Sequence, residues 1–106
     1  MMSKNEISVL ELQKMIEKKA HFKLIDVREG WERDIAKLED DIHIPLSNWQ
    51  PEKLPNNIEL VFYCHHGVRS RYVVDQLLAN NISSIYNLTG GINQWSLEID
   101  NTVSVY

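Results

Sequence analysis

The only cysteine of the chain lies in a segment that could perform nucleophilic chemistry. Cys64 follows a short apolar run, and residues 65–70 (His-His-Gly-Val-Arg-Ser) lead from it into a helical pattern. A sulfur between a strand and a helix faces the free backbone N–H groups and the positive dipole end of the helix N-terminus. Arg69 adds a permanent positive charge. We therefore expect Cys64 to be a thiolate nucleophile near neutral pH, in a loop that also binds anions.

The length of this loop separates two kinds of chemistry. Cysteine-dependent phosphatases use a longer loop between cysteine and arginine, whereas four residues separate Cys64 from Arg69 here. The smaller ring of amides suits a single sulfur atom carried on Cys64 better than a phosphate. An inert core cysteine is the alternative, since most free cysteines behave as small hydrophobic residues. The polar residues that follow Cys64 argue against it, because a buried strand end has no use for them.

Composition limits the class of protein and its partners. The 106 residues suffice for one domain with a modest core, and 43% hydrophobic with 25% charged residues is typical of soluble proteins. A net charge of −4 argues against nucleic acid or an anionic membrane as the main partner. No apolar run could span a bilayer and residues 1–6 lack a signal-peptide core, so we expect a cytoplasmic location. One cysteine excludes an intramolecular disulfide and zinc sites built on paired cysteines.

Strand and helix patterns alternate along the chain. Strands are expected at 6–8, 22–27, 42–44, 58–64 and 84–87. Helices are expected from Ser8 onward and at 30–35, 70–80 and 92–97, with short helical pieces at 47–49 and 51–54. Helical crossovers between strands predict an α/β domain with a mostly parallel sheet of about five strands, covered by helices on both faces. The Cys64 loop would then lie at the carboxyl edge of the sheet.

Several local features carry further expectations. Ser8 and Glu11 have the spacing of a capping box at the start of the first helix. The apolar stripe of that helix is expected to consist of Leu12, Met15 and Ile16 and to belong to the core. Residues 36–41 are expected to form a solvated acidic loop, and residues 99–106 a tail on the surface.

The charges at the end of the strand at 22–27 have two interpretations. Asp26 and Arg28 are expected to support the site structurally, through ion pairs or by holding neighbouring loops. Alternatively, one of these charges touches substrate, because ligands bind at strand ends of open α/β sheets.

Four stretches together point to a known family. They are 24–29 with Trp31-Glu32, then 42–46, then 63–70, and finally 88–92 with Trp95. In order and spacing they resemble single-domain rhodaneses, a family of sulfurtransferases, over about residues 6–99. The resemblance implies a three-layer rhodanese-like fold with a five-stranded sheet and residues 100–106 as a C-terminal tail. Residues 36–41 depart from the family, since acidic residues replace a glycine- and proline-containing run.

The resemblance also implies a chemistry. Cys64 would accept a sulfane sulfur and carry it as a persulfide, and Arg69 would help to bind an anionic donor such as thiosulfate. The remaining loop residues are expected to bind substrate, mainly through their amides: His65, His66, Gly67, Val68 and Ser70. Cyanide or a thiol, including a protein thiol, would take the sulfur. No cofactor beyond the persulfide and no metal is expected, because adjacent histidines cannot easily face one ion and a metal would block the thiolate.

Two other functions stay open at this point. The first is a phosphatase or arsenate reductase, which the loop length and the lack of a second cysteine disfavour. The second is a non-catalytic binding module on the same fold, which the presence of Cys64 disfavours.

Overall fold

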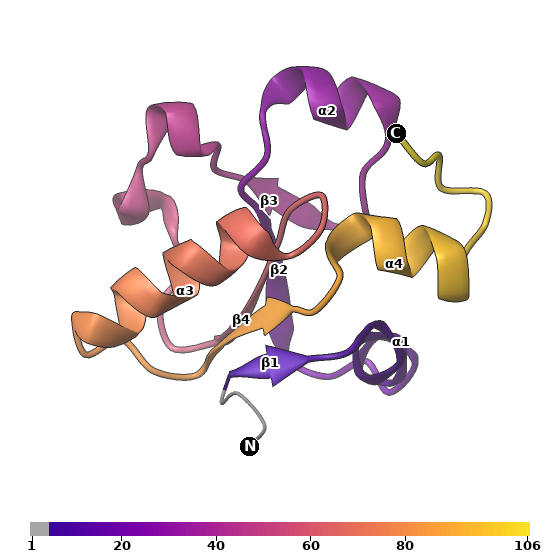
Figure 1. The fold of residues 1–106 in the computed structure, drawn as a ribbon. Coiled ribbons are helices and arrows are strands. Elements are labelled where there is room, and N and C mark those ends of the chain that lie inside the picture. Colours follow the sequence, from indigo (N-terminus) through magenta and orange to yellow (C-terminus); the bar gives the residue numbers. More distant parts are fainter. Residues whose placement is uncertain (1–4) are drawn as a thin grey trace.

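A computed structural model describes residues 5–106, which contain a five-stranded sheet (Figure 1). The strands are β1 (Glu6–Ile7), β2 (Phe22–Asp26), β3 (Asp41–His43), β4 (Glu59–Tyr63) and β5 (Ile85–Leu88). The helices are α1 (Val9–Glu17), α2 (Gly30–Ile35), α3 (Val68–Ala79) and α4 (Gly91–Glu98), with single 3₁₀ turns at Leu46–Asn48 and Pro51–Lys53. Part of the segment on which the signal-peptide expectation rests, Met1 to Lys4, lies outside the described residues.

The sheet has the order β1-β5-β4-β2-β3, and every pairing between neighbours is parallel. The prediction of an α/β fold with a mostly parallel sheet is therefore confirmed. Because all strands run the same way, their carboxyl ends share one edge. The segments after β2 and β4 meet there with the start of α4 (Figure 1), where the Ile92 N–H donates to the Cys64 carbonyl, so residues far apart in sequence come together at the Cys64 loop.

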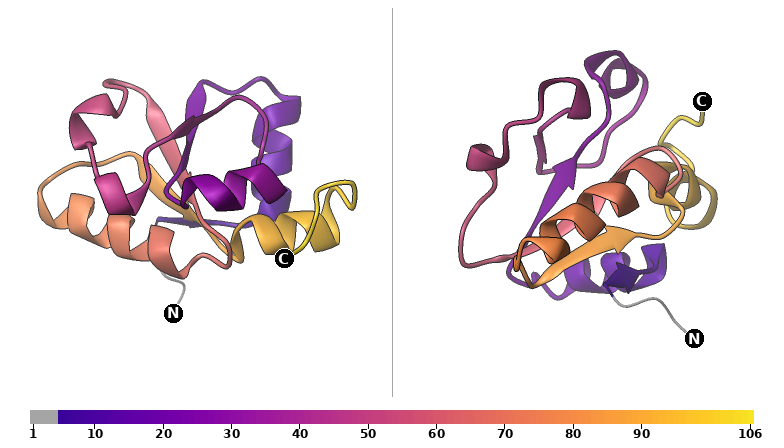
Figure 2. Two further views of the ribbon diagram at one scale, coloured as in Figure 1. Left: turned by 90° about the horizontal axis from the view of Figure 1, so that it is seen from above. Right: turned by 60° about the vertical axis from the view of Figure 1, so that its left-hand side comes forward.

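Side chains of the central strand alternate between two cores. Leu60 and Phe62 of β4 pack in one cluster with Val73 and Val74 of α3. The intervening residues of β4 pack in a second cluster with residues of α1 and α4, on the opposite face. Figure 2 shows these helices on both sides of the sheet. The strand is apolar at successive positions because both of its faces are covered.

The first helix follows its sequence signals closely at one end. The Ser8 side chain accepts a hydrogen bond from the Glu11 N–H, and the Glu11 carboxylate accepts one from the Ser8 N–H, so the predicted capping box is confirmed. Leu12 is fully buried, but Ile16 is 45% exposed, so its assignment to the core was wrong. The stripe runs through Leu12 and Met15 at a three-residue spacing, which turns Ile16 toward the edge of the helix.

Two segments predicted to be solvated pack against the body of the protein. Leu38 in the acidic loop is buried, and the Asp41 side chain is only 2% exposed because it pairs with Arg33. In the C-terminal tail, Val103 and Tyr106 pack against the core between the sheet, α1 and α4. Lys37, Glu39 and Asp40 of the loop are exposed as expected, and no residue of 99–106 is fully buried. Both predictions therefore hold except at the residues just described, where charge pairing and apolar contacts with distant residues outweigh local polarity.

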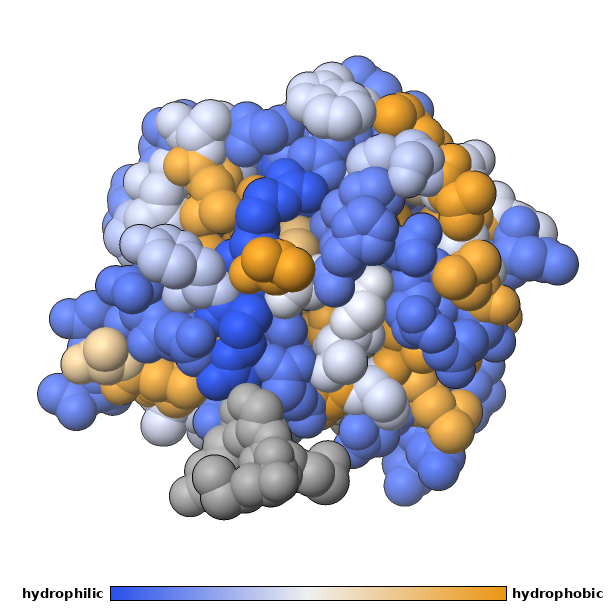
Figure 3. Space-filling model, in the orientation of Figure 1, coloured by the Kyte–Doolittle hydropathy of each residue, from blue (hydrophilic) through white to orange (hydrophobic). Residues whose placement is uncertain are grey.

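The surface is largely polar on the face shown in Figure 3, with hydrophobic residues in separate patches. Val68, at the start of α3, is 75% exposed and so presents an apolar side chain beside the Cys64 loop. None of the helices within residues 5–106 combines the length and the apolar character needed to cross a membrane.

Candidate active site

The Cys64 sulfur is held at the point where β4 ends and α3 approaches. Its Sγ atom accepts hydrogen bonds from the backbone N–H of Gly67 at 3.1 Å and from the backbone N–H of Ser70 at 3.4 Å. The Ser70 hydroxyl lies 3.3 Å from the same sulfur. Cys64 is only 1% exposed, so these donors replace water around the sulfur. Such an arrangement stabilises negative charge on Sγ, because the two backbone N–H groups point their hydrogens at it.

The turn that aims these amides depends on Gly67. This residue has φ of +92°, in the left-handed region that side chains rarely adopt. A Cβ atom there would lie 3.1 Å from both the Gly90 nitrogen and the Leu88 oxygen. The loop therefore needs glycine for its backbone angle and for its close approach to the β5–α4 turn.

The turn between β5 and α4 holds the first carbonyl groups of the Cys64 loop. The Ile92 N–H donates to the Cys64 carbonyl and the Asn93 N–H to the His65 carbonyl, both at 3.0 Å. Gly91 permits this approach, since a Cβ atom there would lie 2.5 Å from each of those two carbonyl oxygens. The first amides of α4 thus satisfy carbonyls of the Cys64 loop and hold it in place.

Asn87 of β5 organises the inner side of the loop. Ser70 donates its hydroxyl hydrogen to the Asn87 Oδ1 atom, while Asn87 Nδ2 donates to the Gly67 carbonyl at 3.1 Å. The same Nδ2 also donates to the Glu6 carboxylate at 3.0 Å. The Ser70 hydroxyl has one hydrogen for two acceptors, Asn87 Oδ1 and Cys64 Sγ. Asn87 did not emerge from the sequence as a site residue, because a single Asn in a strand carries no motif.

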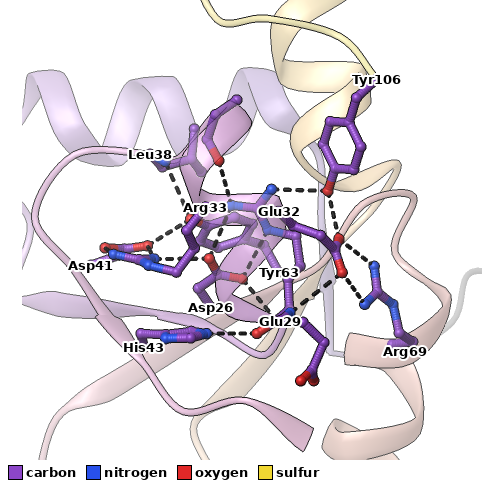
Figure 4. Close-up of polar contacts among 12 residues, drawn as sticks. Asp26, Glu29, Glu32, Arg33, Leu38, Asp41, His43, Tyr63, Arg69 and Tyr106 are labelled. Atoms are coloured by element: carbon purple, nitrogen blue, oxygen red, sulfur yellow. Dashed lines mark hydrogen bonds and ion pairs between the residues drawn. The ribbon is translucent and has the colours of Figure 1, made fainter. Parts of the chain in front are cut away.

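Arg69 lies against a carboxylate. Its two terminal nitrogens donate to the two carboxylate oxygens of Glu32, at 2.7 and 2.8 Å (Figure 4). The Glu32 side chain is 3% exposed and the Arg69 side chain 38%. Hydrogen bonds from Arg69 lower the pKa of Glu32 to about 2, so the carboxylate is charged throughout the neutral range. The sequence placed Glu32 only within the Trp31-Glu32 stretch, and the partner of Arg69 was not predicted.

Tyr106 closes one side of the loop. Its hydroxyl donates to Glu32 Oε2 at 2.6 Å and accepts a hydrogen bond from Arg28 Nη1 at 2.9 Å. Its ring stacks on the ring of His65, with ring centroids 3.7 Å apart and planes inclined by 5°. The ring of His65 also lies against that of His66, with centroids 3.8 Å apart. Burial, together with the neighbouring His66, lowers the pKa of His65. The two histidines and Tyr106 thus form one row of adjoining rings beside the loop.

Asp26 and Arg28 form the buried base of this charged region. Both are fully buried, and Asp26 accepts hydrogen bonds from the Arg28 side chain at 3.0 Å and from Arg33 Nη1 at 2.8 Å. Arg33 also pairs with Asp41 at 2.6 Å. Although burial opposes its charge, the hydrogen bond to Asp26 raises the pKa of Arg28. The structure thus places Asp26 and Arg28 together, linked to the loop through Tyr106 and Glu32 (Figure 4).

Metal ligands do not gather in the described part of the chain. Within residues 5–106, no three His, Cys, Asp or Glu side chains lie close enough together to hold a metal ion. The site therefore consists of one nucleophile, the hydrogen-bond donors around it and a network of ion pairs.

Comparison with known proteins places this geometry in a family. The family model for the rhodanese-like domain matches residues 8–98. The chain is 37% identical over 89 residues to "Rhodanese-like/PpiC domain-containing protein 12, chloroplastic" of Arabidopsis thaliana, covering 78% of this chain and 30% of that protein. It is 27% identical over 92 residues to "Thiosulfate sulfurtransferase GlpE" of Coxiella burnetii, covering 85% of each.

Solved structures agree with the sequence matches. The crystal structure of a rhodanese-like domain protein from Staphylococcus aureus superposes with a TM-score of 0.77 at 27% identity, covering 96% of this chain and 98% of that one. The five-stranded parallel sheet flanked by helices is thus shared with rhodanese-like proteins, as the resemblance predicted. The chain belongs to the rhodanese-like domain family.

Proposed function

We propose that this protein is a sulfurtransferase that moves a sulfane sulfur from a small anionic donor to a thiophilic acceptor through a persulfide on Cys64. The observation that carries the proposal is the environment of the Cys64 sulfur, which accepts two backbone N–H bonds and lies beside the Ser70 hydroxyl. Supporting evidence comes from relatives that include a thiosulfate sulfurtransferase.

In the first step, the Cys64 thiolate attacks the outer sulfur of the donor. With thiosulfate, a bond forms between Cys64 Sγ and that outer sulfur, and the sulfur–sulfur bond of thiosulfate breaks. The electron pair of the broken bond leaves with sulfite, so no external oxidant or proton is needed. The N–H groups of Gly67 and Ser70 stabilise the thiolate beforehand and are positioned to hold the negative charge of the persulfide afterwards.

In the second step, an acceptor attacks the outer sulfur of the persulfide. Cyanide gives thiocyanate, and a thiol gives a new persulfide, while the electron pair of the cleaved bond restores the Cys64 thiolate. Because Cys64 is the only cysteine in the sequence, the thiol acceptor is a separate molecule or protein. Val68, directly before Arg69, is 75% exposed and offers such an acceptor an apolar contact beside the loop.

The test is thiocyanate formation from thiosulfate and cyanide. The wild-type protein is expected to turn over, and Cys64→Ser is expected to reduce the rate to that of the solution without protein. Cys64→Ser keeps a small polar side chain at a buried position, so its thermal unfolding serves as the check on folding. A folded Cys64→Ser variant with wild-type turnover would remove Cys64 from the reaction.

A phosphatase function is the alternative that shares a cysteine loop. Only four residues separate Cys64 from Arg69, fewer than in cysteine-dependent phosphatases, and the shorter loop favours a single added sulfur over a phosphate group. An aryl phosphate assayed beside thiosulfate distinguishes the two. Faster release of phosphate than of thiocyanate would favour the phosphatase.

A further inference from the structure

The charges next to the Cys64 loop balance one another. Three guanidinium groups, those of Arg28, Arg33 and Arg69, are hydrogen-bonded to three carboxylates. These carboxylates belong to Asp26, Asp41 and Glu32. Each arginine therefore has a partner of opposite charge, and this network as a whole adds no net positive charge to the loop.

Arg69 is the member of this network that belongs to the loop itself. Its hydrogen bonds to Glu32 raise the pKa of Arg69, so the guanidinium stays charged while it is paired. Both carboxylate oxygens of Glu32 are occupied by Arg69, and Oε2 also accepts the Tyr106 hydroxyl hydrogen. The guanidinium that the loop contributes is thus already paired with a carboxylate.

The sulfane-sulfur donors differ in charge. Thiosulfate carries two negative charges, whereas a thiosulfonate or a deprotonated hydropersulfide carries one. The second charge of thiosulfate is an advantage only where the site offers uncompensated positive charge. His65 does not supply it, since burial and the neighbouring His66 lower its pKa and favour the neutral ring.

We infer that Glu32 is a specificity-determining residue, which neutralises Arg69 and thereby directs the site toward singly charged sulfur donors and away from thiosulfate. The inference rests on the proposed sulfurtransferase function and specifies its substrate class. Glu32 acts through Arg69 and does not itself touch the transferred sulfur. The Glu32 side chain is buried and accepts two hydrogen bonds from Arg69. It therefore compensates the charge of Arg69 permanently at neutral pH, unlike the carboxylate of an exposed ion pair.

The experiment compares two donors that differ mainly in charge. Thiosulfate and methanethiosulfonate both offer an outer sulfur bonded to an oxidised sulfur, and one carries a methyl group in place of a charged oxygen. Cyanide is the acceptor for both, so the second step and the product, thiocyanate, are common. The quantity of interest is the kcat/KM for thiosulfate divided by the kcat/KM for methanethiosulfonate, in which effects on the amount of folded enzyme cancel.

Glu32→Gln is expected to raise this ratio, because the isosteric amide leaves the charge of Arg69 uncompensated. The expected increase is about tenfold, because one unit of positive charge near the loop is left uncompensated. The increase should shrink at high ionic strength, which a change in packing alone would not produce. The opposite change, Arg69→Gln, leaves the charge of Glu32 in place and should lower the ratio by a similar factor.

Two further variants serve as controls. Asp75→Asn removes one negative charge from an exposed ion pair with Arg71 and should leave the ratio within about twofold of wild type. Tyr106→Phe removes a hydrogen bond to Glu32 without changing any charge, and should also leave the ratio nearly unchanged.

The outcomes separate this inference from the proposed function. Thiocyanate formation by wild type, with opposite shifts of the ratio in Glu32→Gln and Arg69→Gln, supports both. The role of Glu32 would be overturned, while the sulfurtransferase function stands, by either of two results. One is an active, folded Glu32→Gln or Arg69→Gln variant with the wild-type ratio. The other is a shift of the ratio in Asp75→Asn as large as that in Glu32→Gln. If the wild type forms no thiocyanate from either donor, the proposed function fails and this inference fails with it.

Discussion

The stability of the fold should depend strongly on the charge of Asp26. This carboxylate is fully buried and accepts hydrogen bonds from the Arg28 N–H at 2.9 Å and from the Arg28 side chain at 3.0 Å. Arg33 contributes a further bond at 2.8 Å. Asp26→Asn keeps the shape of the side chain and removes its charge, so no cavity complicates the result. The Arg28 guanidinium, which is also fully buried, would then lack its anionic partner.

Breaking a buried ion pair by removing one partner costs about 3–5 kcal/mol. Arg33 retains its bonds to Asp41 at 2.6 and 3.0 Å, and Arg28 retains the Ala36 carbonyl at 2.7 Å and the Tyr106 hydroxyl. We therefore expect a loss near the lower end, about 3 kcal/mol of the free energy of unfolding, out of the roughly 5–15 kcal/mol typical of a domain.

The measurement is urea unfolding followed by the fluorescence of the three tryptophans. The midpoint should fall while the slope of the transition stays the same, since the surface exposed on unfolding is unchanged. Asp75→Asn, which breaks an exposed pair with Arg71, is the matched control and should cost at most about 0.5 kcal/mol. A loss below about 1 kcal/mol for Asp26→Asn would refute the view that Arg28 depends on this carboxylate.

Three further predictions concern the loop and the residues that hold it. Gly91→Ala should lower sulfur transfer and thermal stability, because the added Cβ would lie 2.5 Å from two carbonyl oxygens of the loop. Gly30→Ala places its Cβ in open space and should change neither quantity. Equal losses in the two variants would contradict this role of Gly91. Tyr106→Phe should cost about 1 kcal/mol in urea unfolding through its lost hydrogen bonds, and a cost of zero would show that water replaces them. The pKa of Glu32 lies at about 2, below its ordinary value of 4.5, so its stabilisation is complete above pH 4.5 and is lost as the pH falls toward 2. Glu32→Gln should therefore lose less stability than wild type across that range, and parallel pH profiles would argue against the shift.

Sequence reasoning predicted the parts of the structure that local signals determine. The parallel sheet follows from the alternation of apolar strands with helical segments, and the capping box from the spacing of Ser8 and Glu11. The position of Cys64 between a strand and a helix was also predictable, because β-prone residues precede it and a helical repeat follows Gly67. The structure extends α3 two residues earlier than expected, to Val68, since its first turn begins directly after that glycine.

The partners of the charged residues could not be read from the sequence. Glu32 and Arg69 are 37 positions apart, and Tyr106 reaches Glu32 across 74 positions. Local polarity predicted a solvated segment at 36–41, yet the side chain of Asp41 is only 2% exposed, because Arg33 and the Tyr63 hydroxyl satisfy it. Such pairings are decided by which strand ends meet at the sheet edge, and a single sequence carries no local trace of that meeting.

The central claim is that Cys64 carries the transferred sulfur, and intact-mass measurement after incubation with excess donor tests it most directly. Thiosulfate and methanethiosulfonate should each add the mass of one sulfur atom to the wild-type protein, and cyanide should remove it. Folded Cys64→Ser should gain nothing, while Asp75→Asn should load as wild type does. A wild-type protein that turns over without gaining a sulfur, or a Cys64→Ser variant that still gains one, would contradict the account.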